Sequence, residues 1–260
     1  MPAAQAEVHV EVRELTMAYG SFVIQRDLNF NIYRGDIFVI MGGSGCGKST
    51  LLKHMLGLIP PSAGDILYSG NSFIRAGDRE REAMRQRWGI TYQSGGLFSA
   101  MTLAENVTLP LQLYTRYTPP EIADIVAYKL ALVGLAGYQS YYPSEISGGM
   151  RKRAALARAI ALDPEILFFD EPSAGLDPIS SRLLDELIVQ LQDSIGATVV
   201  MVTHELPSIF AIATNAVYLD ANTRTMIAYG NPADLRDHSN QAVVRQFLTR
   251  SAAAPEEDRA

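Results

Sequence analysis

A glycine-rich run between a strand pattern and a helix pattern constrains the fold of this chain more than any other feature. Residues 36–41 are almost entirely apolar, which is typical of a strand covered on both faces. Residues 42–49 then read Gly-Gly-Ser-Gly-Cys-Gly-Lys-Ser, and apolar side chains recur at helical spacing over residues 51–59. Pro60 and Pro61 should end that helix. This order predicts an α/β domain with a mostly parallel sheet.

The glycine run has the composition of a loop that cradles phosphate groups. Glycines let backbone N–H groups turn inward, and the following helix adds its positive end. Lys48 would reach the β- and γ-phosphates of a nucleotide, and the Ser49 hydroxyl would bind Mg²⁺. A glycine turn without a ligand is the alternative, and the strand and helix on either side argue against it. The candidate nucleotide-binding residues are Gly42, Gly43, Ser44, Gly45, Cys46, Gly47, Lys48, Ser49 and Thr50.

Further strands and helices are predicted on both sides of this loop. Two alternating segments, residues 8–15 and 28–32, predict a small N-terminal antiparallel β subdomain. The segments that predict strands of the main sheet are residues 166–169, 198–202, 216–219 and 225–228. The segments that predict helices are residues 119–133, opened by Thr-Pro-Pro-Glu, and residues 151–162.

The domain organisation follows from these elements. We expect one domain over residues 7–250, with an inserted α-helical lobe at about residues 94–164. Residues 231–250 form a C-terminal extension that either docks on a neighbouring subunit or packs on its own domain. Residues 251–260, Ser-Ala-Ala-Ala-Pro-Glu-Glu-Asp-Arg-Ala, are expected to be a disordered tail.

Polar side chains that follow two of the predicted strands are candidate catalytic groups. Asp170 and Glu171 follow residues 166–169, and ligands of open α/β sheets gather at the carboxyl ends of strands. Asp170 is assigned to Mg²⁺ and Glu171 to the attacking water, although Asp-Glu-Pro could also simply open a loop. His204 follows residues 198–202 and could contact the γ-phosphate or its water, or serve only a structural role.

Three weaker signals have two interpretations each. Ser147, Gly148 and Gly149 precede a helix and could form a second anion-binding corner or a plain N-terminal cap. The amide oxygen of Gln93 could coordinate Mg²⁺, or its side chain could cap a loop. Tyr19 could stack on adenine or belong to a turn.

Composition excludes several classes of protein. The 22 basic and 28 acidic residues give a formal charge of −6, without the basic excess that broad nucleic-acid binding requires. A single cysteine, Cys46, excludes an intrachain disulfide framework and a cysteine-rich zinc site. The longest segment without Asp, Glu, Lys or Arg, residues 88–104, contains glycines and polar side chains, so we expect no membrane-spanning helix. The first seven residues lack the basic start and apolar centre of a secretory signal.

The order of these motifs resembles the ATP-binding subunit of ABC transporters over roughly residues 8–230. The resemblance implies ATP hydrolysis with Mg²⁺, Tyr19 as the adenine-stacking ring and Gln93 as a sensor of both magnesium and permease. It also implies that Ser147, Gly148 and Gly149 bind the γ-phosphate of ATP held by a second copy, in a head-to-tail homodimer. Asp177, at the end of Ser-Ala-Gly-Leu-Asp, would be a dimer contact.

A narrower likeness is to the ATPases of MCE-protein lipid transporters, especially the Mla phospholipid-trafficking system. It rests on Met150, where the family usually has Gln, and on the run that follows it at residues 151–159. Residues 93–98, 106–107, 110–111 and 244–248 indicate the same branch. The Met150 side chain lacks an amide, so no hydrogen bond is transferred to it. The likeness implies membrane permease subunits, an MCE-domain protein, a small accessory subunit and peripheral attachment to the cytoplasmic face of the inner membrane.

Other classes of ATPase fit the motifs less well. A chromosome-associated ATPase would split these motifs with a long coiled coil, and a ribosome-acting tandem ATPase would need two cassettes. Retention of both Glu171 and His204 argues against a non-catalytic interaction protein. Within transporters, the alternative is a cassette for another substrate, such as an amino acid, a metal or a lipoprotein.

Overall fold

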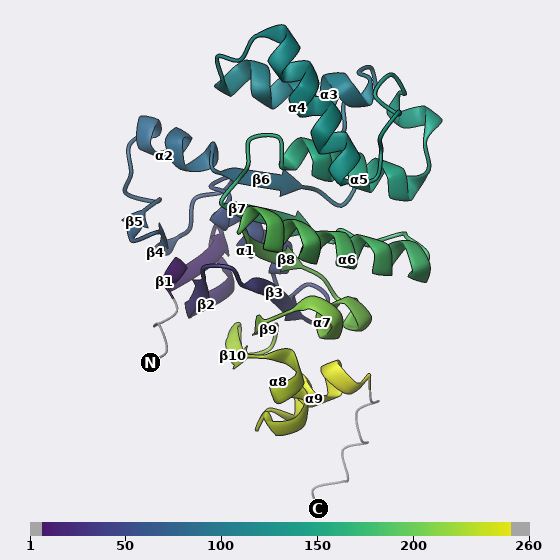
Figure 1. The fold of residues 1–260 in the computed structure, drawn as a ribbon. Helices are drawn as coiled ribbons and strands as arrows, with labels where there is room; N and C mark the ends of the chain where they lie inside the picture. The colour runs from purple at the N-terminus through teal and green to yellow at the C-terminus, as the bar shows by residue number, and fades with distance from the viewer. Residues whose placement is uncertain (1–6, 251–260) are drawn as a thin grey trace, which may run out of the picture.

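The strand that leads into the glycine run lies inside the larger of two β-sheets, and a helical lobe lies at one end of the molecule (Figure 1). The computed structural model describes residues 7–250. The strands are β1 (Val8–Tyr19), β2 (Phe22–Tyr33), β3 (Ile37–Gly42), β4 (Ala63–Tyr68), β5 (Asn71–Ser72), β6 (Trp88–Thr91), β7 (Ile166–Asp170), β8 (Thr198–Val202), β9 (Asn215–Asp220) and β10 (Thr225–Gly230). The helices are α1 (Lys48–Met55), α2 (Asp78–Arg85), α3 (Leu103–Tyr114), α4 (Pro119–Leu132), the short 3₁₀ helix η1 (Pro143–Glu145), α5 (Gly148–Ala159), α6 (Pro178–Ile195), α7 (Leu206–Ile212), α8 (Pro232–His238) and α9 (Ala242–Thr249).

The main sheet has six strands in the order β10-β9-β3-β8-β7-β6, and only the β9–β10 pair is antiparallel. The second sheet has the order β2-β1-β4-β5 and is antiparallel throughout. The predicted fold class, a mostly parallel α/β core with an N-terminal antiparallel β subdomain and a helical lobe, is therefore confirmed.

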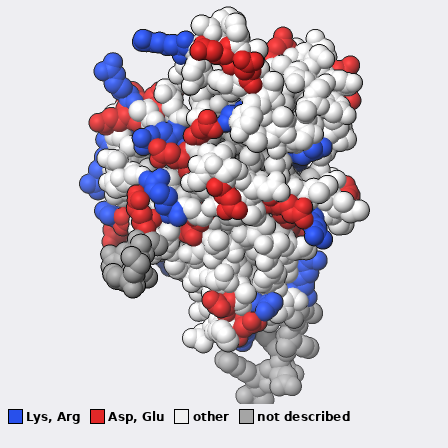
Figure 2. Space-filling model, viewed as in Figure 1, with Lys and Arg blue, Asp and Glu red and all other residues white. Residues whose placement is uncertain are grey.

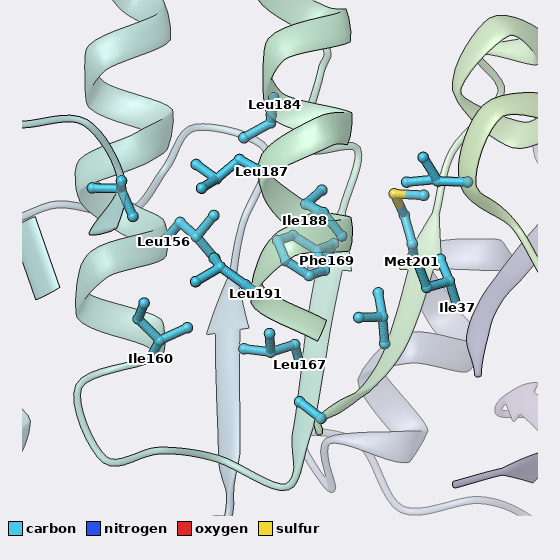
Figure 3. Packing of buried hydrophobic residues seen from close by; sticks show 14 of the residues in the cluster. Ile37, Leu156, Ile160, Leu167, Phe169, Leu184, Leu187, Ile188, Leu191 and Met201 are labelled. Atoms are coloured by element: carbon cyan, nitrogen blue, oxygen red, sulfur yellow. The ribbon is translucent and has the colours of Figure 1, made fainter. Parts of the chain in front are cut away.

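Strand β3 is covered on both faces, as its apolar run predicts. Its six residues are all buried. Phe38 and Ile40 pack in a cluster with α1 and the antiparallel sheet, while Val39 and Met41 pack in a second cluster with α5 and α6. Alternate side chains of a strand point to opposite faces, so one strand supplies both halves of the core. The α5 and α6 side chains of the second cluster that Figure 3 labels are Leu156, Ile160, Leu184, Leu187, Ile188 and Leu191.

The parallel strands bring the predicted catalytic segments to one edge of the sheet. Strands β3, β8, β7 and β6 lie side by side in that order and run parallel. Their carboxyl ends lead into the glycine run, His204, Asp170 with Glu171, and Gln93 respectively. Segments that are far apart in the sequence are thus neighbours at the edge where open α/β sheets bind ligands.

The helical lobe and the C-terminal helices occupy opposite ends of the molecule (Figure 1). Helices α3, α4 and α5 form the lobe, and α8 and α9 lie beyond β9 and β10. Val244 and Leu248 of α9 are buried in the main core cluster, and the Phe247 ring lies 5.3 Å from that of Tyr218. The described part of the C-terminal extension therefore packs on its own domain. The tail predicted at residues 251–260 lies outside the described residues.

Two predicted helices have different bounds in the structure. The helix after the glycine run ends at Met55, so the prediction that Pro60 and Pro61 end it is wrong. Gly57 takes a φ of +67°, its N–H donates to the His54 carbonyl, and the next N–H donates to the Lys53 carbonyl, which is a Schellman cap. Helix α5 begins at Gly148 rather than at residue 151, because Ser147 caps it.

Several elements were not predicted, among them β4, β6, α3 and the 18-residue α6. No helix within residues 7–250 combines the length and apolar character needed to cross a bilayer. On the face shown in Figure 2, basic and acidic side chains are interspersed over a largely uncharged surface.

Candidate active site

The glycine run, residues 42–49, has a backbone shape that two of its positions allow only to glycine. Gly42 has a φ of +148°, and a Cβ there would lie 2.3 Å from the carbonyl oxygen of Leu219. Gly47 has a φ of +100°, and a Cβ there would lie 2.7 Å from the Ile24 side chain. Both distances are far below van der Waals contact, so the loop depends on glycine for φ and for space.

The loop is held in place and carries positive charge. Lys48 donates from Nζ to the carbonyl oxygens of Gly42 and Gly43, at 3.0 and 2.9 Å. Gln25 fastens the loop to the rest of the core, because its Nε2 donates to the Cys46 carbonyl at 2.7 Å. The first turn of α1 contains no acidic side chain and Gly47 offers no side-chain cap, so the helix N-terminus presents its N–H groups to an anion. The Cys46 side chain is buried in the core cluster beside α1, and this burial raises the pKa of its thiol.

Ser49 and Asp170 come together although 121 residues separate them in the sequence. The Ser49 hydroxyl donates to Oδ1 of Asp170 at 3.1 Å. A hydroxyl and a carboxylate beside a phosphate loop form an oxygen donor set of the kind that Mg²⁺ prefers, so these residues fit the metal. Within residues 7–250 there is no group of three or more His, Cys, Asp or Glu side chains placed to hold a metal ion.

Glu171 and His204 form a second direct pair. His204 Nδ1 lies 2.9 Å from Oε1 of Glu171, whose side chain is only 13% exposed. The other carboxylate oxygen, Oε2, is buried and has no hydrogen-bond partner in the described structure. The Glu171 backbone has a positive φ of 50° and its N–H donates to the Val202 carbonyl at 2.9 Å. A carboxylate held by its backbone, with one oxygen paired and one able to accept, has the arrangement of a general base.

Tyr19 lies at the tip of the β1–β2 hairpin, where its partner across the strands is Phe22. Both rings are more than half exposed, and the Arg224 guanidinium lies 5.0 Å from the centre of the Phe22 ring. The hairpin packs against the glycine run, because the Ile24 side chain lies next to Gly47. Tyr19 therefore has the exposure that base stacking requires, and sequence reasoning missed Phe22 beside it.

Ser147 and Asp177 both cap helices in the single chain. The Ser147 hydroxyl accepts from the Met150 N–H at 3.2 Å, and Asp177 accepts from the N–H groups of Ile179 and Ser180, each at 3.0 Å. The hydrogen bonds from Ser180 hold the pKa of Asp177 below its usual range. Ser147 and Gly149 line a groove of about 400 Å³ between the helical lobe and α6. Within residues 7–250, no hydrogen bond joins residues 147–149 to the glycine run, so the structure does not bring these two predicted sites together.

Gln93 follows β6, and its side chain is exposed. Its main-chain carbonyl accepts a hydrogen bond from Lys152 of α5. Sequence reasoning missed Lys152, because nothing in a Met-Arg-Lys-Arg segment distinguishes it from its basic neighbours.

Comparison with known proteins gives consistent matches. A family model described as "ABC transporter" matches residues 25–174. The chain is 41% identical over 246 residues to the intermembrane phospholipid transport system ATP-binding protein MlaF of Haemophilus influenzae, covering 95% of this chain and 92% of that protein. It is 40% identical over 248 residues to the probable ribonucleotide transport ATP-binding protein mkl of Mycobacterium tuberculosis, covering 95% of this chain and 68% of that protein. The dimeric ATP-binding cassette MJ0796, solved in a post-hydrolysis state with ADP and Pi, matches with a TM-score of 0.77 and 28% identity, over 85% of this chain and 98% of that chain.

Proposed function

We propose that this chain, which belongs to the ABC transporter family, is the ATP-hydrolysing subunit that powers phospholipid movement between membranes. The ATPase activity follows from the family. The observation that carries the residue assignments is the pair of direct contacts at the sheet edge, Ser49 with Asp170 and Glu171 with His204. These contacts support a magnesium site formed by Ser49 and Asp170 and a general base at Glu171.

Different residues bind the adenine ring, the phosphates and the metal ion of the nucleotide. Tyr19 stacks on the adenine ring, and the N–H groups of residues 42–50 surround the phosphates. Lys48 exchanges its two loop carbonyls for phosphate oxygens, which are stronger acceptors. Ser49, Asp170 and the Gln93 amide would hold Mg²⁺, and the bound metal would supply positive charge against the charge that develops on the phosphates.

Hydrolysis uses Glu171 and His204. The Glu171 carboxylate accepts a proton from the water that attacks the γ-phosphate, while the His204 ring, 2.9 Å from Oε1, orients that carboxylate and lies ready to contact the γ-phosphate.

A second copy completes the site. Cassettes of this family act as dimers with membrane permeases. Because residues 147–149 lie apart from the chain's own phosphate loop, we assign them to the γ-phosphate of ATP held by the partner subunit, and Asp177 to the contact between copies. ATP then closes a head-to-tail dimer with C₂ symmetry, and hydrolysis removes the shared contact.

The permease would dock in a groove of about 470 Å³ beside Gln93. Its lining includes the exposed apolar side chains of Tyr92, Phe98, Leu113 and Tyr114. The groove lies between β6 and α3. A permease helix docked there would therefore be displaced when the loop that follows Gln93 moves. The motion of the ATPase reaches the membrane by this route.

The assignment of phospholipid as cargo rests on MlaF. The match to MlaF covers nearly the full length of both proteins, whereas the match to mkl, whose name indicates ribonucleotides, covers 68% of mkl. An MCE-domain protein and a small accessory subunit would complete the complex, attached at the cytoplasmic face of the inner membrane.

Two experiments test the proposal. Replacing Lys48 by Ala should abolish ATP binding in a nucleotide titration, and retained affinity would argue against the phosphate-loop assignment. When the tagged chain is purified from membranes of the cells that naturally produce it, a multi-span permease and an MCE-domain protein should be recovered with it. Recovery of a solute-binding protein in their place would reject the phospholipid assignment while leaving the ATPase intact.

A further inference from the structure

Lys152 lies where three parts of the proposed site meet: the Ser147 corner, Gln93 and Glu171. It lies on α5, five residues after the Ser147 cap. Its Nζ donates to the main-chain oxygen of Gln93, at the end of β6. Its ammonium also interacts electrostatically with the Glu171 carboxylate, which raises the pKa of Lys152 against the larger lowering caused by burial.

Helix α5 and the loop after Gln93 are fastened together at more than one point. Arg158, six residues after Lys152, donates to the Gly96 carbonyl at 2.8 Å. The backbones of α5 and β6 also touch directly, because a Cβ on Gly89 would lie 2.4 Å from the carbonyl oxygen of Ala159. A shift of α5 must therefore displace the loop that carries Gln93.

Little free space separates Lys152 from the strand ends. The cavity that Lys152 lines with Thr91, Phe169 and Pro172 has a volume of only about 10 Å³, close to that of a single water molecule. The hydroxyl of Thr91 in its wall is buried without a hydrogen-bond partner. Because there is so little empty space around the Lys152 side chain, a movement of Lys152 must displace its neighbours at the strand ends.

We propose that Lys152 is a positioning residue that couples the two nucleotide sites of the dimer, an inference that rests on the function proposed above. Occupation of the Ser147 corner by the partner's ATP fixes the N-terminus of α5. Lys152, in the second turn of the same helix, then holds the main chain of Gln93 and interacts electrostatically with Glu171 in its own chain. Each active site is thereby set for hydrolysis only when the opposite site is filled.

The test compares Lys152→Met and Lys152→Arg with the unaltered full-length chain. Methionine keeps the apolar stem but removes the charge and the donor. ATP affinity should change less than about twofold, because the phosphate loop is untouched. The maximal rate of hydrolysis should fall about 10- to 100-fold, as expected for a misplaced reacting group. The Hill coefficient for ATP should fall toward 1, and Lys152→Arg should restore both the rate and the cooperativity.

Arg153→Met is the matched control. Arg153 is the next residue on α5, but it donates to the carbonyls of Val133 and Gly134 at 3.0 and 3.2 Å and does not reach Gln93. The Arg153→Met variant should keep the maximal rate of hydrolysis within about threefold and should keep the Hill coefficient of the unaltered chain. Unchanged rate and cooperativity in Lys152→Met would overturn the proposal, and so would a parallel loss of ATP affinity or failure of arginine to rescue. If the unaltered chain neither binds nor hydrolyses ATP, the proposed function itself fails, which is a distinct result.

Discussion

Replacing His204 by Ala should lower the rate of ATP hydrolysis much more than it lowers the free energy of unfolding. The His204 side chain is 58% exposed, and its bond to Glu171 spans 2.9 Å. Exposed pairs contribute about 0.2–1 kcal/mol to folding, and because the Glu171 partner is mostly buried this pair should lie at the upper end, so the free energy of unfolding should fall by about 1 kcal/mol. The same contact orients the candidate base, and general-base catalysis contributes about 10²- to 10⁴-fold to rate. A 100-fold fall in turnover corresponds to about 2.7 kcal/mol of activation free energy, well above the stability loss.

The assay is steady-state phosphate release at saturating ATP, paired with urea unfolding of the same preparations. Arg182→Ala supplies a control, because Arg182 forms a pair of similar length, at 3.0 Å, with Glu186 on α6, although both side chains of that pair are exposed. The control should lose a similar small amount of stability and keep its turnover. If His204→Ala retains turnover within about threefold, or if Arg182→Ala loses as much, the assigned role of the Glu171–His204 pair is refuted.

Three further predictions concern the loop, the metal and pH. Gly42→Ala should abolish ATP binding in a nucleotide titration, because a φ of +148° and the 2.3 Å approach to Leu219 add at least about 1–3 kcal/mol of strain, whereas Gly43→Ala, with nothing within 4 Å of its Cβ position, should retain binding. Ser49→Ala should raise the Mg²⁺ concentration for half-maximal hydrolysis about tenfold or more, in a magnesium titration, because a contact worth about 1.5–3 kcal/mol to a charged group is lost. Burial lowers the pKa values of His9 and His54 from their ordinary 6.5. The unfolded chain therefore binds more protons as the pH falls below 6.5, so urea unfolding should show declining stability between pH 7 and pH 5, with a shallower decline in His54→Gln.

The local patterns in the sequence were sufficient to predict three of the four parallel strands that end at the candidate site. The apolar run before the glycine loop, and the two that precede Glu171 and His204, are strands of the same sheet. Burial on both faces of a parallel sheet leaves this signal in the sequence directly, since every residue must be apolar. Because parallel strands end at one edge, predicting these strands also predicted that the candidate side chains which follow them lie at the same edge of the sheet.

Elements whose stability comes from tertiary contacts left no comparable signal. Strand β6 is only four residues long and includes Gly89, which serves the close approach of α5 rather than strand formation. The end of α1 depends on Gly57 in a Schellman cap, and the more conspicuous prolines that follow are not needed. Lys152 could not be separated from Arg151 and Arg153 by sequence, because only the packed position of α5 decides which of the three reaches Gln93.

The most direct test of the central claim, an ATP-driven dimer that hydrolyses its ligand, uses Glu171→Gln. The amide has the size of the carboxylate but cannot accept the proton of the attacking water. Light scattering of this variant should show a monomer without nucleotide and a stable dimer with ATP, while phosphate release falls about 100-fold or more. A variant that stays monomeric in ATP, or that hydrolyses ATP at the rate of the unaltered chain, would contradict the account.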